Sequence, residues 1–117
     1  MRLGSRLRRR RKQVTISVYS KSVSSGQLAE SAVSGLVNIK ATKEPAGQDP
    51  EIVTEAGVIV IATDNFYFDQ ISGSLPAITE NHLLIDSDSA RYEVVTRPFA
   101  LAGEDNRLKV ITRKVNN

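Results

Sequence analysis

Hydrophobic and polar residues alternate with a period of two along most of this chain. In residues 14–18, Val-Thr-Ile-Ser-Val, three β-branched apolar residues alternate with hydroxyl residues. This pattern is typical of a strand that buries one face. The alternation recurs in residues 36–43, 91–97 and 107–115. These four segments therefore predict strands that turn one face toward a common core.

Two further segments are apolar without a clear polar face. Residues 58–61, Val-Ile-Val-Ile, are apolar at every position, which predicts a central strand that continues toward Phe68. Residues 83–86 form a shorter strand. Within Phe66-Tyr67-Phe68 the two phenylalanines share one face, which favours core packing over base stacking. The sequence thus predicts an all-β fold, a small six-stranded barrel or sandwich.

The connections between these strands fall into tight turns and long loops. Residues 86–89, Asp-Ser-Asp-Ser, predict a hairpin turn, and residues 102–106 predict the next one. Residues 20–35, 44–57 and 70–81 predict long loops, which are uncommon in a small domain unless they have a function. A short helix over residues 27–34 is an alternative for part of the first loop.

Charge divides the 117-residue chain into an arm and one domain. Seven of the sixteen basic residues lie in the first twelve positions, and the remaining nine face all thirteen acidic residues, so the rest of the chain carries a net charge of −4. The basic residues of the arm are Arg2, Arg6, Arg8, Arg9, Arg10, Arg11 and Lys12. We predict an extended basic arm over residues 1–12, ordered only against a partner, and a β-domain over residues 13–117.

Composition limits the classes of function. The chain has no cysteine, which excludes disulfides and thiolate metal sites. No apolar run approaches the roughly 20 residues that cross a bilayer, and the basic N-terminus lacks the apolar stretch of a signal peptide. We therefore expect neither a membrane partner nor export by that route.

Candidate catalytic and metal-binding residues do not form recognisable motifs. His82, the single histidine, stands at the start of a strand pattern, and no serine near it lies in a nucleophile motif. Asp86 and Asp88 resemble the start of a calcium loop, but Arg91 replaces the required glycine. Asp64 and Asp69 are interpreted as strand-end polar residues. The sequence predicts no catalytic residues, no metal and no cofactor, and hence a protein that is not an enzyme.

The basic arm leaves three interpretations open. It could contact about five to seven phosphates of a nucleic acid. It could instead bind an acidic protein neighbour, or it could be a solubilising tail without a binding role.

The C-terminal third suggests a family. The run His82-Leu-Leu-Ile-Asp-Ser-Asp-Ser-Ala-Arg-Tyr-Glu-Val-Val, followed by Leu108-Lys-Val-Ile-Thr-Arg, resembles the strand, turn, x-Tyr-x-Val, loop and closing strand of tailed-phage head-completion proteins. These are small β-barrel head-tail connector or stopper subunits that cap the portal. The order of strands and loops resembles that of the family over residues 13–115. The sequence motif itself is similar only over residues 82–113. The arginine-rich leader departs from the family pattern.

The resemblance implies a virion protein of the phage neck, assembled in the host cytoplasm. Its subunits would form a homo-oligomeric ring between a portal or adaptor protein and a tail protein, and would retain or pass the double-stranded DNA in the channel. Tyr92 and Val94 would be core positions. The loop 70–81 would contact the channel or a neighbour, and its candidate residues are Gln70, Ser72, Ser74, Leu75 and Glu80. The alternative hypothesis is a small β-barrel nucleic-acid-binding module that uses the basic arm.

Overall fold

A computed structural model provides the fold. It describes residues 12–24, 26–46, 51–53, 59–101 and 107–115. Throughout these residues the secondary structure consists of β-strands, with no helix. The predicted all-β class is therefore confirmed. Residues 1–11 of the basic arm and the predicted turn at 102–106 lie outside the described residues.

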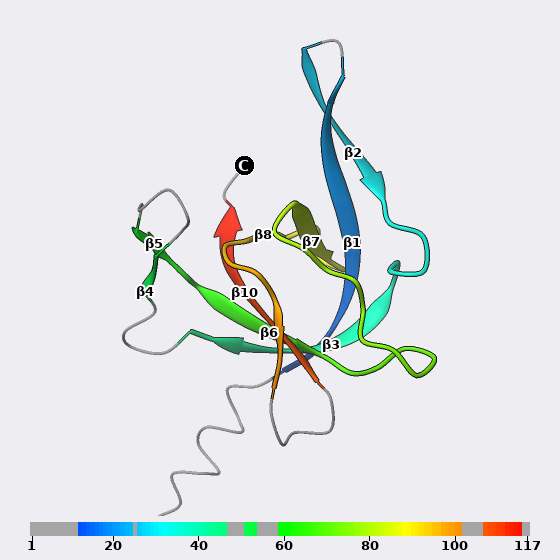
Figure 1. The fold of residues 1–117 in the computed structure, drawn as a ribbon, viewed down its shortest axis with the longest axis vertical. Coiled ribbons are helices and arrows are strands. Elements are labelled where there is room, and N and C mark those ends of the chain that lie inside the picture. The colour runs from blue at the N-terminus through cyan, green and yellow to red at the C-terminus, as the bar shows by residue number, and fades with distance from the viewer. Residues whose placement is uncertain (1–11, 25, 47–50, 54–58, 102–106, 116–117) are drawn as a thin grey trace, which may run out of the picture.

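Six antiparallel strands close into a barrel (Figure 1). They are β1 (Lys12–Ser24), β3 (Ile39–Pro45), β6 (Asp64–Phe68), β7 (His82–Asp86), β8 (Arg91–Val94) and β10 (Leu108–Val115). Their order around the barrel is β1-β3-β6-β10-β8-β7, and β7 pairs again with β1, for example Val18 with Leu84. This last pairing decides between the two predicted architectures in favour of a closed barrel.

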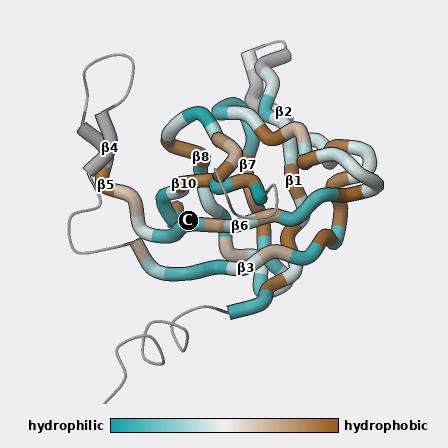
Figure 2. The backbone as a smooth tube through the Cα atoms, turned by 60° about the horizontal axis from the view of Figure 1, so that its bottom comes forward, coloured by the Kyte–Doolittle hydropathy of each residue, from teal (hydrophilic) through white to brown (hydrophobic). Residues whose placement is uncertain are grey.

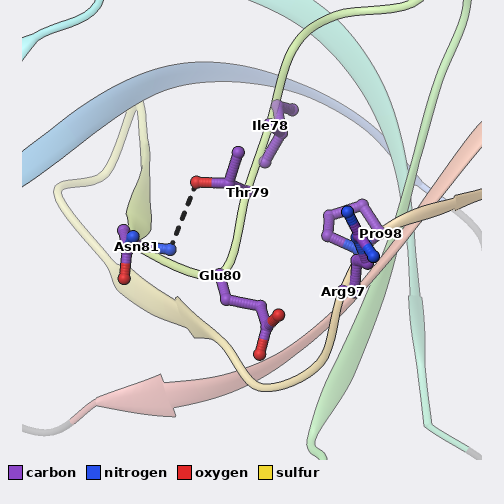
Figure 3. Close-up of a pocket in the computed structure, with 6 residues that line it drawn as sticks. All are labelled: Ile78, Thr79, Glu80, Asn81, Arg97 and Pro98. Carbon is purple, nitrogen blue, oxygen red and sulfur yellow. Dashed lines mark hydrogen bonds between the residues drawn. The ribbon is translucent and has the colours of Figure 1, made fainter.

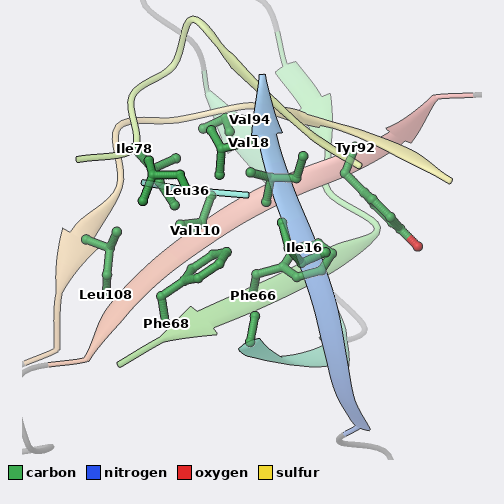
Figure 4. Packing of buried hydrophobic residues seen from close by; sticks show 12 residues of the cluster. Ile16, Val18, Leu36, Phe66, Phe68, Ile78, Tyr92, Val94, Leu108 and Val110 are labelled. Carbon is green, nitrogen blue, oxygen red and sulfur yellow. The ribbon is translucent and has the colours of Figure 1, made fainter. Parts of the chain in front are cut away.

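The alternating pattern of the sequence becomes the inside and outside of this barrel. In β8 and in the first half of β10 the side chain at every second position is buried, and hydrophobic and hydrophilic residues alternate along the barrel strands (Figure 2). In β6, by contrast, Phe66, Tyr67 and Phe68 are all buried. The cluster shown in Figure 4 draws on all six barrel strands, on Leu36 between β2 and β3, and on Ile78 between β6 and β7. Its largest fully buried members are Tyr92, Phe66, Phe68, Ile16, Leu84, Val18 and Val110. The predicted inward positions Tyr92 and Val94 are confirmed, at 1% and 7% exposure.

Four further strands lie outside the closed barrel. They are β2 (Gln27–Ala32), β4 (Glu51–Val53), β5 (Ile59–Ile61) and β9 (Phe99–Ala100). β2 pairs with the far end of β1, β9 pairs with β10, and β4 and β5 form a separate two-stranded sheet, which we call the β4–β5 ribbon.

The predicted long loop at residues 20–35 is wrong for most of its length. β1 continues to Ser24, and β2 returns along it with Ser22 opposite Ala29. The alternative helix at 27–34 is also wrong, since residues 27–32 are strand. Glu30 of β2 forms an ion pair with Arg91 of β8, which links this hairpin to the barrel. Pairing with β1 thus overrides the weak strand propensity of Gln, Ala and Glu.

The predicted central strand at residues 58–68 is wrong in its first half. Only β6 lies in the barrel, between β3 and β10, and residues 59–61 pair instead with β4. Ala62 and Thr63 separate the two strands, and the Thr63 amide donates to the carbonyl of Thr112 (2.9 Å).

The other strand predictions are confirmed with shifted ends: β3 begins at Ile39, and β8 ends at Val94. The Asp86–Ser89 turn is also confirmed, since Ser89 N–H donates to the Asp86 carbonyl (3.0 Å).

Candidate functional site

The connection from β6 to β7, residues 69–81, crosses one end of the barrel. It must cross because β6 and β7 are not neighbours: β6 pairs with β3 and β10, whereas β7 pairs with β1 and β8. Ile78 enters the core at 5% exposure and thereby closes this end, which we call the crossover end (Figure 4). Ser72 and Gly73 have positive φ angles of 52° and 86°, and they form the tip of the connection.

An apolar cleft lies between this connection and the segment that leads from β2 to β3. It encloses about 260 Å³. It is lined by Val33, Ser34, Leu36, Ile71, Ser74, Leu75, Pro76 and Ala77. The volume is below the roughly 300 Å³ at which small-molecule pockets begin. The apolar cleft therefore suits an apolar side chain of a protein better than a free ligand.

A polar pocket of about 550 Å³ lies where the same connection meets the segment after β8. Figure 3 shows its lining: Ile78, Thr79, Glu80, Asn81, Arg97 and Pro98. Asn81 N–H donates to the hydroxyl of Thr79 (3.3 Å), which fixes the turn before β7. Glu80 and Arg97 are both exposed and have opposite charges. The polar pocket thus offers both signs of charge to a partner.

His82 anchors the end of the connection. Thr79 N–H donates to His82 Nδ1 (3.0 Å), and His82 N–H donates to the carbonyl of Thr79 (3.1 Å). Burial lowers the pKa of His82 below its usual value of 6.5. The ring is therefore neutral at pH 7 and serves as a hydrogen-bond acceptor within this turn.

The opposite end of the barrel carries Lys43 and Tyr92. Lys43 Nζ donates to the hydroxyl of Tyr92 (3.3 Å) and lies 5.6 Å from the centre of its ring. Burial alone would lower the pKa of Lys43, but the bond to Tyr92 and the nearby Asp64 and Asp86 raise it overall. Burial raises the pKa of Tyr92, against the opposing effect of Lys43. Both groups are consequently protonated at neutral pH, and neither is suited to act there as a base or nucleophile.

A third cluster surrounds Tyr67, which lies on the opposite face of β6 from Phe66 and Phe68 and is buried at 7% exposure. Its ring lies 5.4 Å from the guanidinium carbon of Arg107 and 5.8 Å from Lys109 Nζ. The Tyr67 hydroxyl donates to Glu44 Oε1 (2.5 Å). Lys109 pairs across the strands with Tyr67 on one side and with Phe99, 44% exposed, on the other. This row presents a cation beside an exposed aromatic ring.

The sequence predicted that Tyr67 takes the face of its strand opposite to Phe66 and Phe68, but it gave no indication that Tyr67 is buried within this cluster. Its members come from β3, β6, β9, β10 and Arg107, the residue before β10, and their adjacency depends on the order of strands around the barrel. The alternation of Phe66-Tyr67-Phe68 was a signal that Tyr67 points outward. No local signal identified which cations would cover it.

The loop residues named from the sequence separate into three places. Ser74 and Leu75 line the apolar cleft, and Glu80 lines the polar pocket. Gln70 and Ser72 are exposed outside both openings. Of the basic arm, only Lys12 is described: it is exposed, begins β1 and pairs with Lys43. Arg2, Arg6, Arg8, Arg9, Arg10 and Arg11 lie outside the described residues.

The described residues lack two features that would point to other classes of function, a metal site and a membrane-spanning helix. Within them no group of three or more His, Asp or Glu side chains gathers to hold a metal ion. Nor does this part of the chain contain a helix long and apolar enough to cross a bilayer. In comparisons with known proteins, no family model and no curated protein matches the chain.

Proposed function

We propose that this protein is a structural subunit of a phage neck, which assembles into a ring between a portal or adaptor protein and the tail. The observation that carries the proposal is a small closed barrel with two strand pairs that extend from it, the β1–β2 hairpin and the β4–β5 ribbon (Figure 1). Among the described residues, β2 and β4 each pair with one strand only. Open strand edges favour contacts between subunits.

The resemblance of residues 82–113 to head-completion proteins gives this assembly its context. In that family the corresponding Tyr and Val are core residues, and here Tyr92 and Val94 are buried in the barrel. The long connection 69–81 lies across one end of the barrel, a position from which it can reach a neighbour or a channel. The basic arm would bind a neighbouring subunit or the DNA in the channel.

The proposal is tested by the mass of the full-length protein in solution. Light scattering over a concentration series and negative-stain electron microscopy should show a closed ring of defined mass. A protein that stays monomeric up to about 1 mM, where even weak association would be detected, contradicts the proposal. The gene's neighbours give a second test: an adjacent portal or capsid gene supports it, and a replication or ribosomal cluster contradicts it.

The row of Lys109 and Phe99 on the outer face favours a second candidate, a nucleic-acid-binding module that also uses the basic arm. An exposed aromatic ring beside a cation can stack on a base while the cation contacts phosphate. In this case log K for DNA should fall with log salt by about 0.9 for each phosphate contacted. Deletion of residues 2–12 should flatten this slope, and Phe99→Ala should weaken binding to single strands. Absence of salt-sensitive DNA binding would exclude this candidate.

A further inference from the structure

The polar pocket lies where two neighbouring strands of the barrel separate. The pairing of β7 with β8 ends at Leu83 opposite Glu93. After β8 the chain stays with β10 instead, since Val95 N–H donates to the carbonyl of Ile111 (3.0 Å). The connection 69–81 and the segment after β8 therefore diverge, and they become the two walls of the pocket (Figure 3).

The wall formed by the connection is fixed by hydrogen bonds within the chain. Thr79 N–H donates to His82 Nδ1 (3.0 Å), and the Thr79 hydroxyl accepts from Asn81 N–H (3.3 Å). On the other wall the ring of Pro98 restricts its own φ angle. A pocket whose walls are already ordered loses little conformational entropy when a ligand binds.

The size and the lining of the pocket suit a small charged ligand. Its volume of about 550 Å³ falls within the roughly 300–1,000 Å³ of small-molecule sites, and all its lining residues belong to the described part of the chain. Glu80 and Arg97 come from different walls, and neither forms an ion pair within the described residues. Ile78, 5% exposed, and Pro98 add apolar surface. The pocket thus combines a carboxylate, a guanidinium and an apolar contact.

We propose that the polar pocket binds a small zwitterionic ligand of the amino-acid or short-peptide class. The guanidinium of Arg97 pairs with the ligand carboxylate, which it can hold through two parallel N–H bonds. Glu80 pairs with the ligand ammonium group. The Thr79 hydroxyl, whose oxygen accepts a backbone N–H, keeps its own proton to donate to the ligand. An apolar side chain of the ligand contacts Ile78 and Pro98.

The two charges of the pocket select against ligands with only one charge. An anion is attracted by Arg97 but repelled by Glu80, and a cation meets the reverse. Only a ligand that carries both signs gains from both side chains. Because one chain supplies the whole lining, the site goes beyond the ring assembly proposed above and does not depend on it.

Binding is tested with L-leucine and the dipeptide glycylleucine as probes. In ¹⁵N NMR titrations of the full-length protein, at least one of them should shift the amides of Thr79, Glu80 and Asn81 to saturation, with a dissociation constant of about 1 mM or below. Two analogues of leucine are the ligand controls: 3-methylbutylamine lacks the carboxylate, and 4-methylpentanoate lacks the ammonium group. Each should bind at least about tenfold more weakly.

Charge substitutions test the two assigned roles. Glu80→Gln and Arg97→Gln should each weaken binding about tenfold or more and leave the fold intact, because both side chains are exposed. Glu80→Arg alone should abolish binding. The double variant, Glu80→Arg with Arg97→Glu, again offers both signs and should restore binding with the ligand reversed. Asp88→Asn is the matched control, since Asp88 is equally exposed but lies outside the pocket.

The outcomes decide the proposal whether or not the protein forms a ring. If neither probe shifts the amides of residues 79–81 up to about 20 mM, the pocket is not a site for this class of ligand. If the singly charged analogues bind as tightly as leucine, recognition of both charges is wrong. The same holds if the double variant keeps the melting temperature of the wild type but does not regain binding.

Discussion

The two ends of the barrel are closed in different ways. At one end, which we call the strand end, side chains of the barrel strands cover the core. The rings of Tyr92 and Phe66 pack edge to face with their centres 4.9 Å apart, and Lys43 donates to the hydroxyl of Tyr92. At the crossover end, the connection 69–81 covers the core and leaves two openings beside it. The strand end is completed by one chain, whereas the crossover end retains surfaces that a partner could fill.

This difference bears on where stability and binding are located. At the strand end Thr112 is fully buried, and its hydroxyl donates to the carbonyl of Asp64 (2.8 Å). At the crossover end the residues that shape the openings are largely exposed, including Ile71, Ala77 and Glu80. Substitutions at the strand end should therefore change stability, and substitutions at the crossover end should change association.

The largest effect is expected for Tyr92→Ala. Removing a fully buried aromatic ring leaves a cavity among Phe66 and its neighbours, and should lower the free energy of unfolding by about 3–5 kcal/mol. Urea denaturation measures this loss. The matched substitution at the crossover end, Ile71→Ala, should cost less than about 1 kcal/mol, because Ile71 is exposed. Equal losses would contradict the distinction between the two ends.

A smaller effect is expected when the Thr112 hydroxyl is removed. Thr112→Val keeps the shape of the side chain but removes the donor to the Asp64 carbonyl, at a cost of about 1–3 kcal/mol. The control is Thr79→Val at the crossover end, where the hydroxyl accepts from Asn81 N–H in an exposed turn. We expect it to change stability by less than about 0.5 kcal/mol. Thermal melts of the two variants compare them directly.

The strand positions could be read from the sequence because burial of one face is a local pattern. Residues 14–18 and 108–112 alternate, and Ile16, Val18, Leu108 and Val110 are buried inside the barrel. The closure of the barrel could not be predicted from the sequence, since it depends on the pairing of β1 with β7, which are far apart in the chain. β2 was missed because Gln, Ala and Glu are weak strand formers and only its pairing with β1 reveals it.

The candidate site was predicted only in outline. The length and the Gly and Pro content of residues 70–81 predicted a long connection, which the structure confirms, and its contact with a channel or a neighbour stays a prediction. That Leu75 faces the apolar cleft and Glu80 the polar pocket depends on residues 33–36 and 97–98, which meet the connection only in the folded barrel. Residues 58–61 were assigned to a central strand because an apolar run does not reveal which strand it pairs with, and the pairing of β5 with β4 appears only in the fold.

Alkaline pH should affect the strand end. The pKa values of Lys43 and Tyr92 are both raised on folding, so the folded state holds these protons more tightly than the unfolded chain. The stabilisation is complete below the ordinary pKa of about 10 and is lost as pH rises through the folded values. Urea titrations between neutral and alkaline pH should show this loss. Tyr92→Phe should reduce it, because that variant has neither the titrating phenol nor its bond to Lys43.

Acid should act on the crossover end, with the smallest effect. Burial lowers the pKa of His82, so the folded state favours the neutral ring, whose Nδ1 accepts from Thr79 N–H. Stability from this group is complete above pH 6.5 and is lost as pH falls through the folded pKa, because the unfolded chain then binds a proton first. His82 is the single histidine, so its NMR titration is unambiguous and should have its midpoint below 6.5. Protonation turns Nδ1 into a donor and should loosen the Thr79 turn, which hydrogen exchange at the Thr79 amide would detect. A midpoint above 6.5, or exchange at Thr79 that does not follow the His82 titration, would mean that the neutral ring does not hold this end of the connection in place.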